Sequence, residues 1–280
     1  MYTLYPLIAV LGESGSTIID RMNFKRTRIS PQQIMPVMFF SMSILLLAFI
    51  LITHQPFPHY TLVSAGLMVL IILVSFVGNI FDYRSLKVDD LSLREPMADF
   101  EPIAGGLVGY ILFASERKPS LLIAFLLGII VVYWGTHRRK LRRVQKKGMW
   151  FMLLAVCFYG LLPSLYMLAL DSIAPAYIML VRVIAILMLS LAFFPQKHLR
   201  KLSPTKLRYG LLAGLSCSIG TVAGLYAISS IGVVLTAVLM MLGPAVRYCA
   251  GYFLLKEKVK NGQMASSLAL AVIVLAAVAV

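Results

Sequence analysis

Residues 34–53 read IMPVMFFSMSILLLAFILIT, a run of 20 positions without a charged side chain. About 20 apolar residues make a helix long enough to cross the hydrocarbon core of a membrane. The whole chain of 280 residues is 60% hydrophobic and 13% charged, whereas about 25% of the residues in soluble domains are charged. We therefore predict an all-α, polytopic membrane protein of about ten transmembrane helices joined by short loops. The other apolar segments lie near residues 1–19, 61–81, 91–113, 120–136, 149–170, 175–194, 208–228, 232–255 and 264–280.

The basic residues are divided unevenly between the two sets of alternating loops. The net charge is +15, and 21 of the 26 Lys and Arg residues fall in loops on one side, whereas the opposite loops carry only Arg117 and Lys118. Loops rich in Lys and Arg stay in the cytoplasm. We therefore predict that the basic loops are cytoplasmic, that both termini lie outside, and that the protein resides in the cell membrane. The basic run at 137–143 is interpreted as a topology anchor in contact with the lipid bilayer and not as a nucleic-acid site; binding of anionic lipid is the alternative.

Two smaller features have simple interpretations. The three cysteines lie in apolar segments without the spacing of metal ligands, so we interpret Cys157, Cys217 and Cys249 as packing residues. Residues 1–10 lack a basic region and a cleavage site, so they are interpreted as the start of the first helix. We expect Asp20 and Arg21 to end that helix.

The two halves of the chain resemble each other weakly. An offset of 142 residues aligns five identical residues over 33 positions, three of them Gly or Pro, which have specific backbone roles. Five helices per half would give the copies opposite orientations, as in the inverted repeats of transporters. We predict a first repeat over residues 1–136, a basic cytoplasmic linker over 137–148 and a second repeat over 149–280. The aligned pairs are Gly78 with Gly220, Leu93 with Leu235, Pro102 with Pro244, Gly109 with Gly251, and Tyr110 with Tyr252.

Two stretches at equivalent places in the halves carry a recognisable motif. Residues 101–117 read EPIAGGLVGYILFASER, and residues 243–258 read GPAVRYCAGYFLLKEK. Both resemble the end of the fourth helix of an EamA-type repeat, in which a Pro, small residues and an aliphatic run precede Gly-Glu. Glu116 and Glu257 match the glutamate, whereas Ser115 and Lys256 replace the glycine.

The resemblance extends to the second helix of the second half, where Arg182 matches an arginine common in such repeats; the first half has Met38 there. It implies the drug/metabolite transporter superfamily, with ten helices in two inverted five-helix repeats. It also implies a central cavity that the fifth and tenth helices do not line. Members commonly have both termini in the cytoplasm, in contrast to the orientation that the charges predict here.

Acidic residues concentrate on the expected fourth helix. Six of the 11 acids fall within residues 82–101. A charge inside a membrane span costs about 2.5–3.5 kcal/mol and usually faces a bundle interior or a wet cavity. One interpretation is a structural ion-pair network; the other is that these carboxylates bind protons or substrate. The coupling candidates on this helix are Glu95, Asp99 and Glu101, which accompany Arg94.

Isolated polar residues in other spans complete the candidate site. Arg182 and Arg247 are candidates, with Arg94, for binding an anionic group, because a guanidinium can bind a carboxylate or phosphate through two hydrogen bonds. The alternative is that both neutralise acids of the fourth helix. Glu13, between Gly12 and Ser14, is a further coupling candidate, and Tyr166 and Tyr248 are candidate cavity residues.

Small residues and prolines also mark the spans. The pairs Gly105–Gly109, Gly210–Gly214 and Gly220–Gly224 have the GxxxG spacing that lets helices pack closely. Pro96, Pro102, Pro163 and Pro244 interrupt spans, and interrupted helices often form transporter sites.

These features favour a secondary active transporter that moves a small anionic or zwitterionic metabolite by alternating access. A proton-coupled exporter of lipophilic cations is the first alternative. A membrane-embedded, Mg-dependent transferase acting on lipid pyrophosphates is the second, since Asp89 and Asp90 offer an acidic pair. We expect no enzymatic activity, no metal or other cofactor and no nucleic-acid partner, and a monomer or homodimer.

Overall fold

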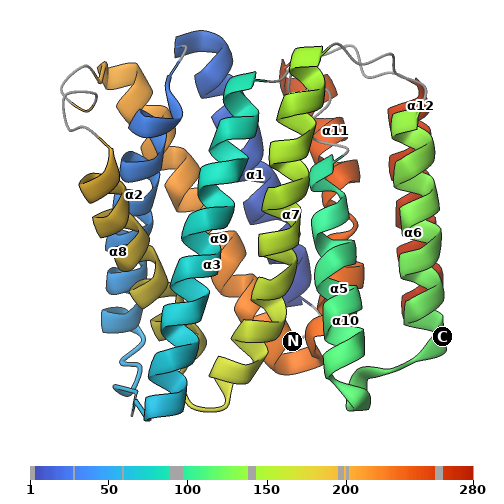
Figure 1. Ribbon diagram of the computed structural model, residues 1–280, viewed down its shortest axis with the longest axis horizontal. Helices are drawn as coiled ribbons and strands as arrows, with labels where there is room; N and C mark the ends of the chain where they lie inside the picture. Colours follow the sequence, from blue (N-terminus) through green and yellow to red (C-terminus); the bar gives the residue numbers. More distant parts are fainter. Residues whose placement is uncertain are drawn as a thin grey trace.

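The computed structural model describes residues 4–27, 29–58, 60–88, 97–137, 143–194, 199, 202–255 and 261–279, and in these ranges it contains helices and no strand. The bundle is drawn in Figure 1. Its helices are α1 (Leu4–Thr27), α2 (Pro31–Ile52), α3 (Leu62–Val88), α5 (Phe100–Leu112), η1 (Ala114–Glu116), α6 (Pro119–His137), α7 (Arg143–Leu170), α8 (Pro175–Phe193), α9 (Pro204–Ile231), α10 (Val233–Met240), α11 (Gly243–Leu255) and α12 (Asn261–Ala279).

Within the part of the chain that the structure describes, six helical segments are long and apolar enough to cross a membrane, as expected of a polytopic membrane protein. They coincide with six of the ten predicted spans. Three more predicted spans correspond to the shorter apolar helices Phe100–Leu112, Pro119–Trp134 and Ala265–Val278. The tenth corresponds to α1, whose apolar part also contains Glu13, Asp20 and Arg21.

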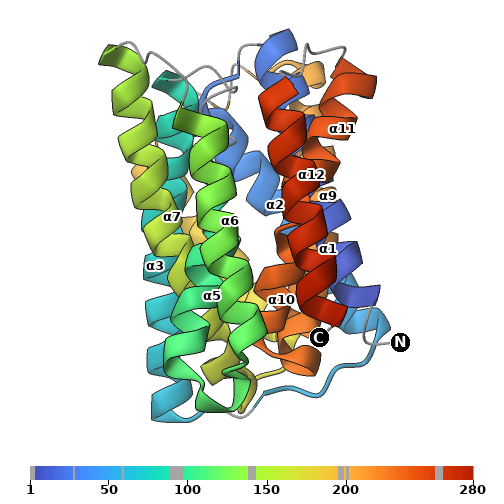
Figure 2. The ribbon, with the colours of Figure 1, turned by 90° about the vertical axis from the view of Figure 1, so that its right-hand side faces the viewer.

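The helices of the two halves interleave. α1 packs chiefly on α9, and α3 packs chiefly on α7, so each half contributes to both of the most extensive contacts. α5 lies against α7 and α10, and α6 lies against α12 at one side of the bundle (Figures 1 and 2). The result is a single bundle in which any central space is bounded by both halves.

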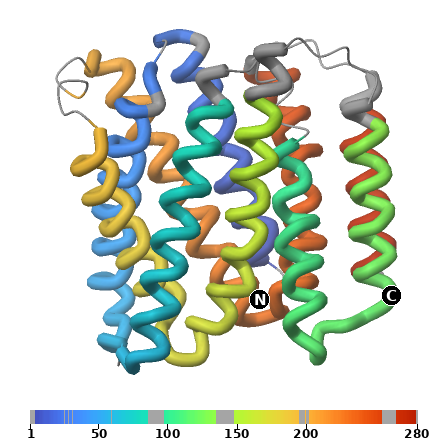
Figure 3. Tube along the Cα trace, viewed as in Figure 1, coloured from blue at the N-terminus to red at the C-terminus, as the bar shows by residue number. Residues whose placement is uncertain are grey.

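The ends of the bundle differ in charge. α1 begins and α12 ends toward the same end of the bundle, which we call the far end (Figure 3). The other end, where α1 and α3 finish and α9 begins, carries Arg26, Arg84 and Arg208; we call it the basic end. Arg117 and Lys118 follow η1 at the far end.

Two predicted helix boundaries were wrong. α1 does not end near Asp20 but continues to Thr27, because polar contacts support its last turns: Arg26 Nη1 donates to the hydroxyl of Tyr209 on α9 at 2.7 Å. α7 begins at Arg143, inside the predicted linker, because a basic sequence can be helical outside the apolar core. The predicted span 232–255 is present as two consecutive helices, in keeping with the predicted interruption, since Pro244 has no N–H to continue the hydrogen bonding of α10.

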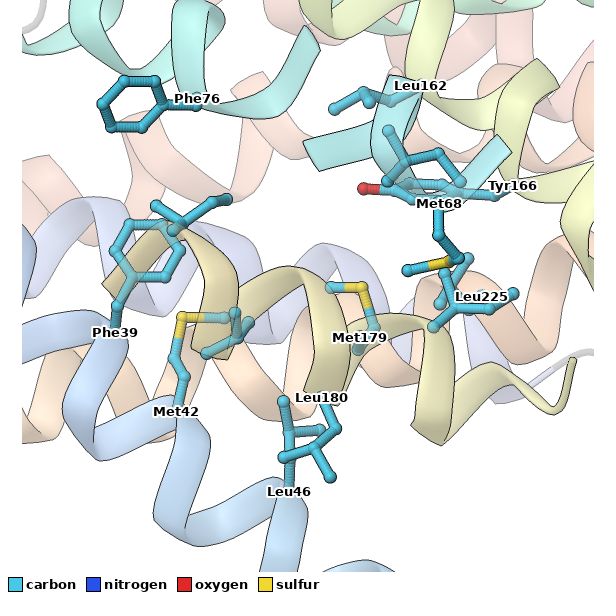
Figure 4. Packing of buried hydrophobic residues seen from close by; sticks show 14 of the residues in the cluster. Phe39, Met42, Leu46, Met68, Phe76, Leu162, Tyr166, Met179, Leu180 and Leu225 are labelled. Atoms are coloured by element: carbon cyan, nitrogen blue, oxygen red, sulfur yellow. The ribbon is translucent and has the colours of Figure 1, made fainter. Parts of the chain in front are cut away.

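The largest apolar cluster joins α2, α3, α7, α8 and α9. Figure 4 shows its Met, Leu and aromatic side chains meeting between these helices. Phe39, Met42 and Met179 belong both to this cluster and to the wall of the cavity described next. The packed core therefore holds one side of the cavity in place.

Candidate functional site

A cavity of about 310 Å³ lies between the halves. It is lined by residues of α1, α2, α3, α5, α7, α8, α9, α10 and α11, and of the segment just before α5. Among the described side chains, α6 and α12 contribute no lining residue, as the family resemblance implied. Pro102 and Pro163 line it, as does Gly243 at the break between α10 and α11. The polar and charged lining residues are Glu13, Ser14, Ser16, Thr17, Asp20, Asn79, Asp82, Tyr83, Glu101, Tyr159, Tyr166, Arg182, Cys217, Thr221, Thr236 and Arg247.

Glu13 lies beside a close approach of α1 and α9. A Cβ atom added to Gly220 would be only 2.6 Å from the backbone nitrogen of Glu13 and 2.9 Å from the carbonyl carbon of Gly12. The hydroxyl of Ser216 on α9 donates to the carbonyl oxygen of Gly12 at 2.8 Å. The backbone that carries the Glu13 carboxylate is thus fixed against α9.

Arg182 enters the cavity from α8. Its guanidinium carbon lies 5.8 Å from the ring centre of Tyr166, a cation–π arrangement, and Nη1 lies 3.6 Å from the sulfur of Met179. Its Nε is buried without a hydrogen-bond partner. Over the described ranges, neither Arg182 nor Glu13 forms an ion pair, although each attracts the other electrostatically.

Arg247 is paired instead. Its Nη2 donates to Oδ1 of Asp99 at 2.6 Å, and both side chains are largely buried. Asp99 lies in the turn just before α5, and Gly243 leaves the guanidinium room, since an added Cβ there would be 3.2 Å from Nη1. The sequence left two roles open for the arginines, binding of an anionic group or neutralisation of an acid on the predicted fourth helix. Arg247 neutralises such an acid, whereas Arg182 has no such partner among the described residues.

Two cavity carboxylates were not predicted as site residues. Asp20 lies seven residues after Glu13, which places both on the same face of α1, so helical spacing could have identified it. Asp82 on α3 also lines the cavity, close to the basic end, and only its membership of the acidic stretch pointed to it. With Glu13 and Glu101, four carboxylates face the cavity together with two guanidinium groups.

Part of the cavity wall is apolar and rich in sulfur. Met38, the residue that departs from the family arginine, lines the cavity and accepts a hydrogen bond from the Tyr83 hydroxyl at 3.5 Å. Phe39, Met42 and Met179 extend this wall. Methionine side chains adapt to ligands of different shapes.

Several predicted site residues lie elsewhere. Tyr248 is on α11 but is not among the lining residues, because its side chain leaves the helix in a different direction from that of Arg247 one position earlier. Arg94 and Glu95 lie outside the described residues, as do Pro96, Asp89 and Asp90. Cys217 lines the cavity instead of serving only to pack, whereas Cys157 and Cys249 are exposed on helix surfaces. Over the described ranges, no group of three or more His, Cys, Asp or Glu residues could hold a metal ion.

Comparisons with known proteins agree with this architecture. The model of the EamA-like transporter family matches residues 146–280. A solved structure titled only "Crystal structure of protein" superposes with a TM-score of 0.75 at 14% identity, covering 99% of this chain and 96% of its own. At that identity the likeness shows a shared fold. No curated protein matches the chain.

Proposed function

Residues 146–280 of this integral membrane protein form an EamA domain of the drug/metabolite transporter superfamily, and from that membership we propose that the protein is a secondary active transporter of a small zwitterionic metabolite. The observation that carries the proposal is the arrangement of Glu13 and Arg182. Both face one cavity, and over the described ranges neither has an ion-pair partner. A ligand with an anionic and a cationic group could satisfy both.

The charge of the cavity favours a zwitterion over a simple anion. Four carboxylates and two guanidinium groups line it, and one of those guanidinium groups is already bound to Asp99. A zwitterion can place its anionic end on Arg182 and its cationic end on Glu13, whereas a simple anion would leave Glu13 without an ion-pair partner. Its apolar part would lie on the methionine wall.

The buried carboxylate of Glu13 supports a second function, the export of lipophilic cations. A cation could bind Glu13 and rest against Tyr166 and the methionine wall. In either case Glu13 is our candidate for proton coupling, because a carboxylate that binds substrate in one state and a proton in the other links the two fluxes.

For the mechanism we propose alternating access between two inverted five-helix repeats. The contacts support this assignment because they correspond on exchange of the halves: α1 packs on α9 and α11, and α7 packs on α3 and α5. The α6–α12 contact joins the fifth helices of the two proposed repeats. We assign the basic end to the cytoplasm, following the positive-inside rule.

A thermal-shift screen of the detergent-purified protein tests the proposal. A ligand that binds only the folded state raises the unfolding midpoint by an amount set by its concentration relative to Kd. The panel contains zwitterionic amino acids, organic anions and lipophilic cations, measured at two pH values, with Arg182→Gln as the matched variant. Stabilisation by zwitterions that Arg182→Gln abolishes would support the proposal and supply a substrate for transport into liposomes. Stabilisation by cations alone, unchanged in Arg182→Gln, would favour the second function.

A further inference from the structure

The carboxylate of Glu116 joins the two halves at the far end of the cavity. The backbone N–H of Val233 donates to Oε1 at 3.1 Å, and that of Val234 donates to Oε2 at 2.6 Å. Glu116 thereby binds the first turn of α10, where free N–H groups and the helix dipole favour a negative charge. Val233 itself lines the cavity. A residue of the motif in the first half thus holds a cavity helix of the second half.

Neighbouring residues on both sides allow and support the contact that Glu116 makes with α10. Gly232 has φ +84, a conformation that favours glycine, and a Cβ added there would be 2.6 Å from the carboxylate carbon of Glu116. On the other side, Arg117 donates to the carbonyl oxygens of Tyr110 and Ile111, at 3.0 and 2.6 Å. η1 is therefore fixed to the end of α5, and Glu116 connects α5 with α10.

Toward the basic end, a different contact connects α5 with the segment formed by α10 and α11. α5 packs far more on α10 than on α11, and after the break at Met241–Leu242 α11 diverges from α5 toward the basic end (Figure 2). The Asp99–Arg247 ion pair spans this divergence. Each end of the boundary between α5 and α10–α11 thus has its own polar contact between the halves.

We propose that these contacts are the two gates of the cavity. Glu116 closes the far end, and Asp99 with Arg247 restrains the basic end. This inference rests on the proposed alternating access, in which one contact must break while the other holds. In this structure the Glu116 contact is made through two backbone hydrogen bonds, so the far gate is shut.

Cys217 provides a test that needs no substrate, since its thiol lines the cavity. In a Cys157→Ser, Cys249→Ser background it is the sole cysteine. A small, charged, membrane-impermeant methanethiosulfonate is applied to sealed vesicles of both orientations, and the labelling rate from each side is measured. Glu116→Gln keeps one acceptor oxygen but places an amide donor opposite the second backbone N–H, so one charge-assisted hydrogen bond is lost. Such a bond contributes about 1.5–3 kcal/mol. We expect labelling from the far side to rise at least about tenfold, and Asp99→Asn to raise labelling from the basic side only.

Three controls keep the result interpretable. Asp171→Asn makes the same charge change at an exposed position in the turn between α7 and α8 and should leave both rates unchanged. Gly232→Ala disturbs the Glu116 contact from the opposite side and should reproduce the effect of Glu116→Gln. A Ser190→Cys reporter, placed at a fully buried position of α8 outside the cavity, detects general loosening. The gate assignment is overturned if far-side labelling of Cys217 is unchanged in both Glu116→Gln and Gly232→Ala. It is also overturned if these substitutions raise labelling of the Ser190→Cys reporter as much as they raise labelling of Cys217. Neither result depends on whether a substrate is found.

Discussion

Replacing Gly220 with Ala should disturb the site without removing any of its functional groups. The new Cβ would lie 2.6 Å from the nitrogen of Glu13 and 2.9 Å from the carbonyl carbon of Gly12, and both are backbone atoms that cannot rotate away. α1 and α9 must therefore separate by roughly 1 Å, since ordinary carbon contacts are about 3.5–4.0 Å. Overpacking of this kind costs about 1–3 kcal/mol.

Gly224 gives a matched control on the same helix. A Cβ there would lie 3.8 Å from the Cβ of Ala9, an ordinary contact. Both substitutions gain the same helix propensity, about 1 kcal/mol over glycine. The difference between the variants therefore isolates the steric term, and we expect Gly220→Ala to be less stable than Gly224→Ala by about 1–3 kcal/mol.

The measurement is the unfolding midpoint of both purified variants in one detergent. At about 2–4 °C per kcal/mol for chains of this order of size, Gly220→Ala should unfold roughly 2–12 °C below Gly224→Ala. It should also bind ligand more weakly, because the backbone of Glu13 is displaced. Equal midpoints and equal affinities would refute the inference that the α1–α9 contact positions Glu13.

Three further predictions concern the cavity side chains. Arg182→Gln should weaken binding of the zwitterion found in the screen by roughly 10–100-fold, from loss of charge-assisted bonds, while Arg26→Gln at the basic end should leave binding unchanged in the same titration. Tyr166→Leu, which removes the aromatic face beneath Arg182, should weaken binding by about 2–5-fold, the equivalent of about 0.5–1 kcal/mol, whereas Tyr166→Phe should bind like the parent protein. Glu13→Gln should retain exchange of substrate between two sides of a liposome but lose uptake driven by a proton gradient; retention of gradient-driven uptake would exclude Glu13 as the coupling residue.

The sequence was sufficient for much of the fold because each membrane span is a local signal. Twenty apolar residues predict a helix wherever they occur, and all ten predicted segments contain helices among the described residues. The predicted helix ends were wrong where contacts outside the apolar run stabilise the helix. The last turns of α1 depend on a contact between Arg26 and Tyr209, which are 183 residues apart.

The sequence predicted several residues that line the cavity, but not which of them contact each other. An ionisable residue inside a span is conspicuous, so Glu13, Glu101, Arg182 and Arg247 were identified, and all four line the cavity. Hydropathy gives no information about which of them meet. Arg182 and Arg247 looked alike in the sequence, yet one is paired with Asp99 and the other rests on an aromatic ring.

Gly220 and Gly224 likewise show that the sequence does not reveal which glycine of a pair contacts the neighbouring helix. Their spacing predicts a close helix contact for both, but only Gly220 touches another backbone. A GxxxG pair defines a flat stripe, and the crossing point of the partner helix decides which glycine is used. Here Gly12 of α1 meets Gly220, so a backbone contact between the two helices lies beside Glu13, the carboxylate that we propose for coupling.

The motif glutamate illustrates how a local pattern can encode a long-range contact. In the sequence, Glu116 marks only the end of an apolar helix; in the structure it binds the start of another helix 117 residues later. α5 ends and α10 begins at the far end of the bundle, so a carboxylate just after one helix meets the free N–H groups at the start of the other. Its position at the boundary between the halves is also the position from which a single side chain can control whether the halves separate.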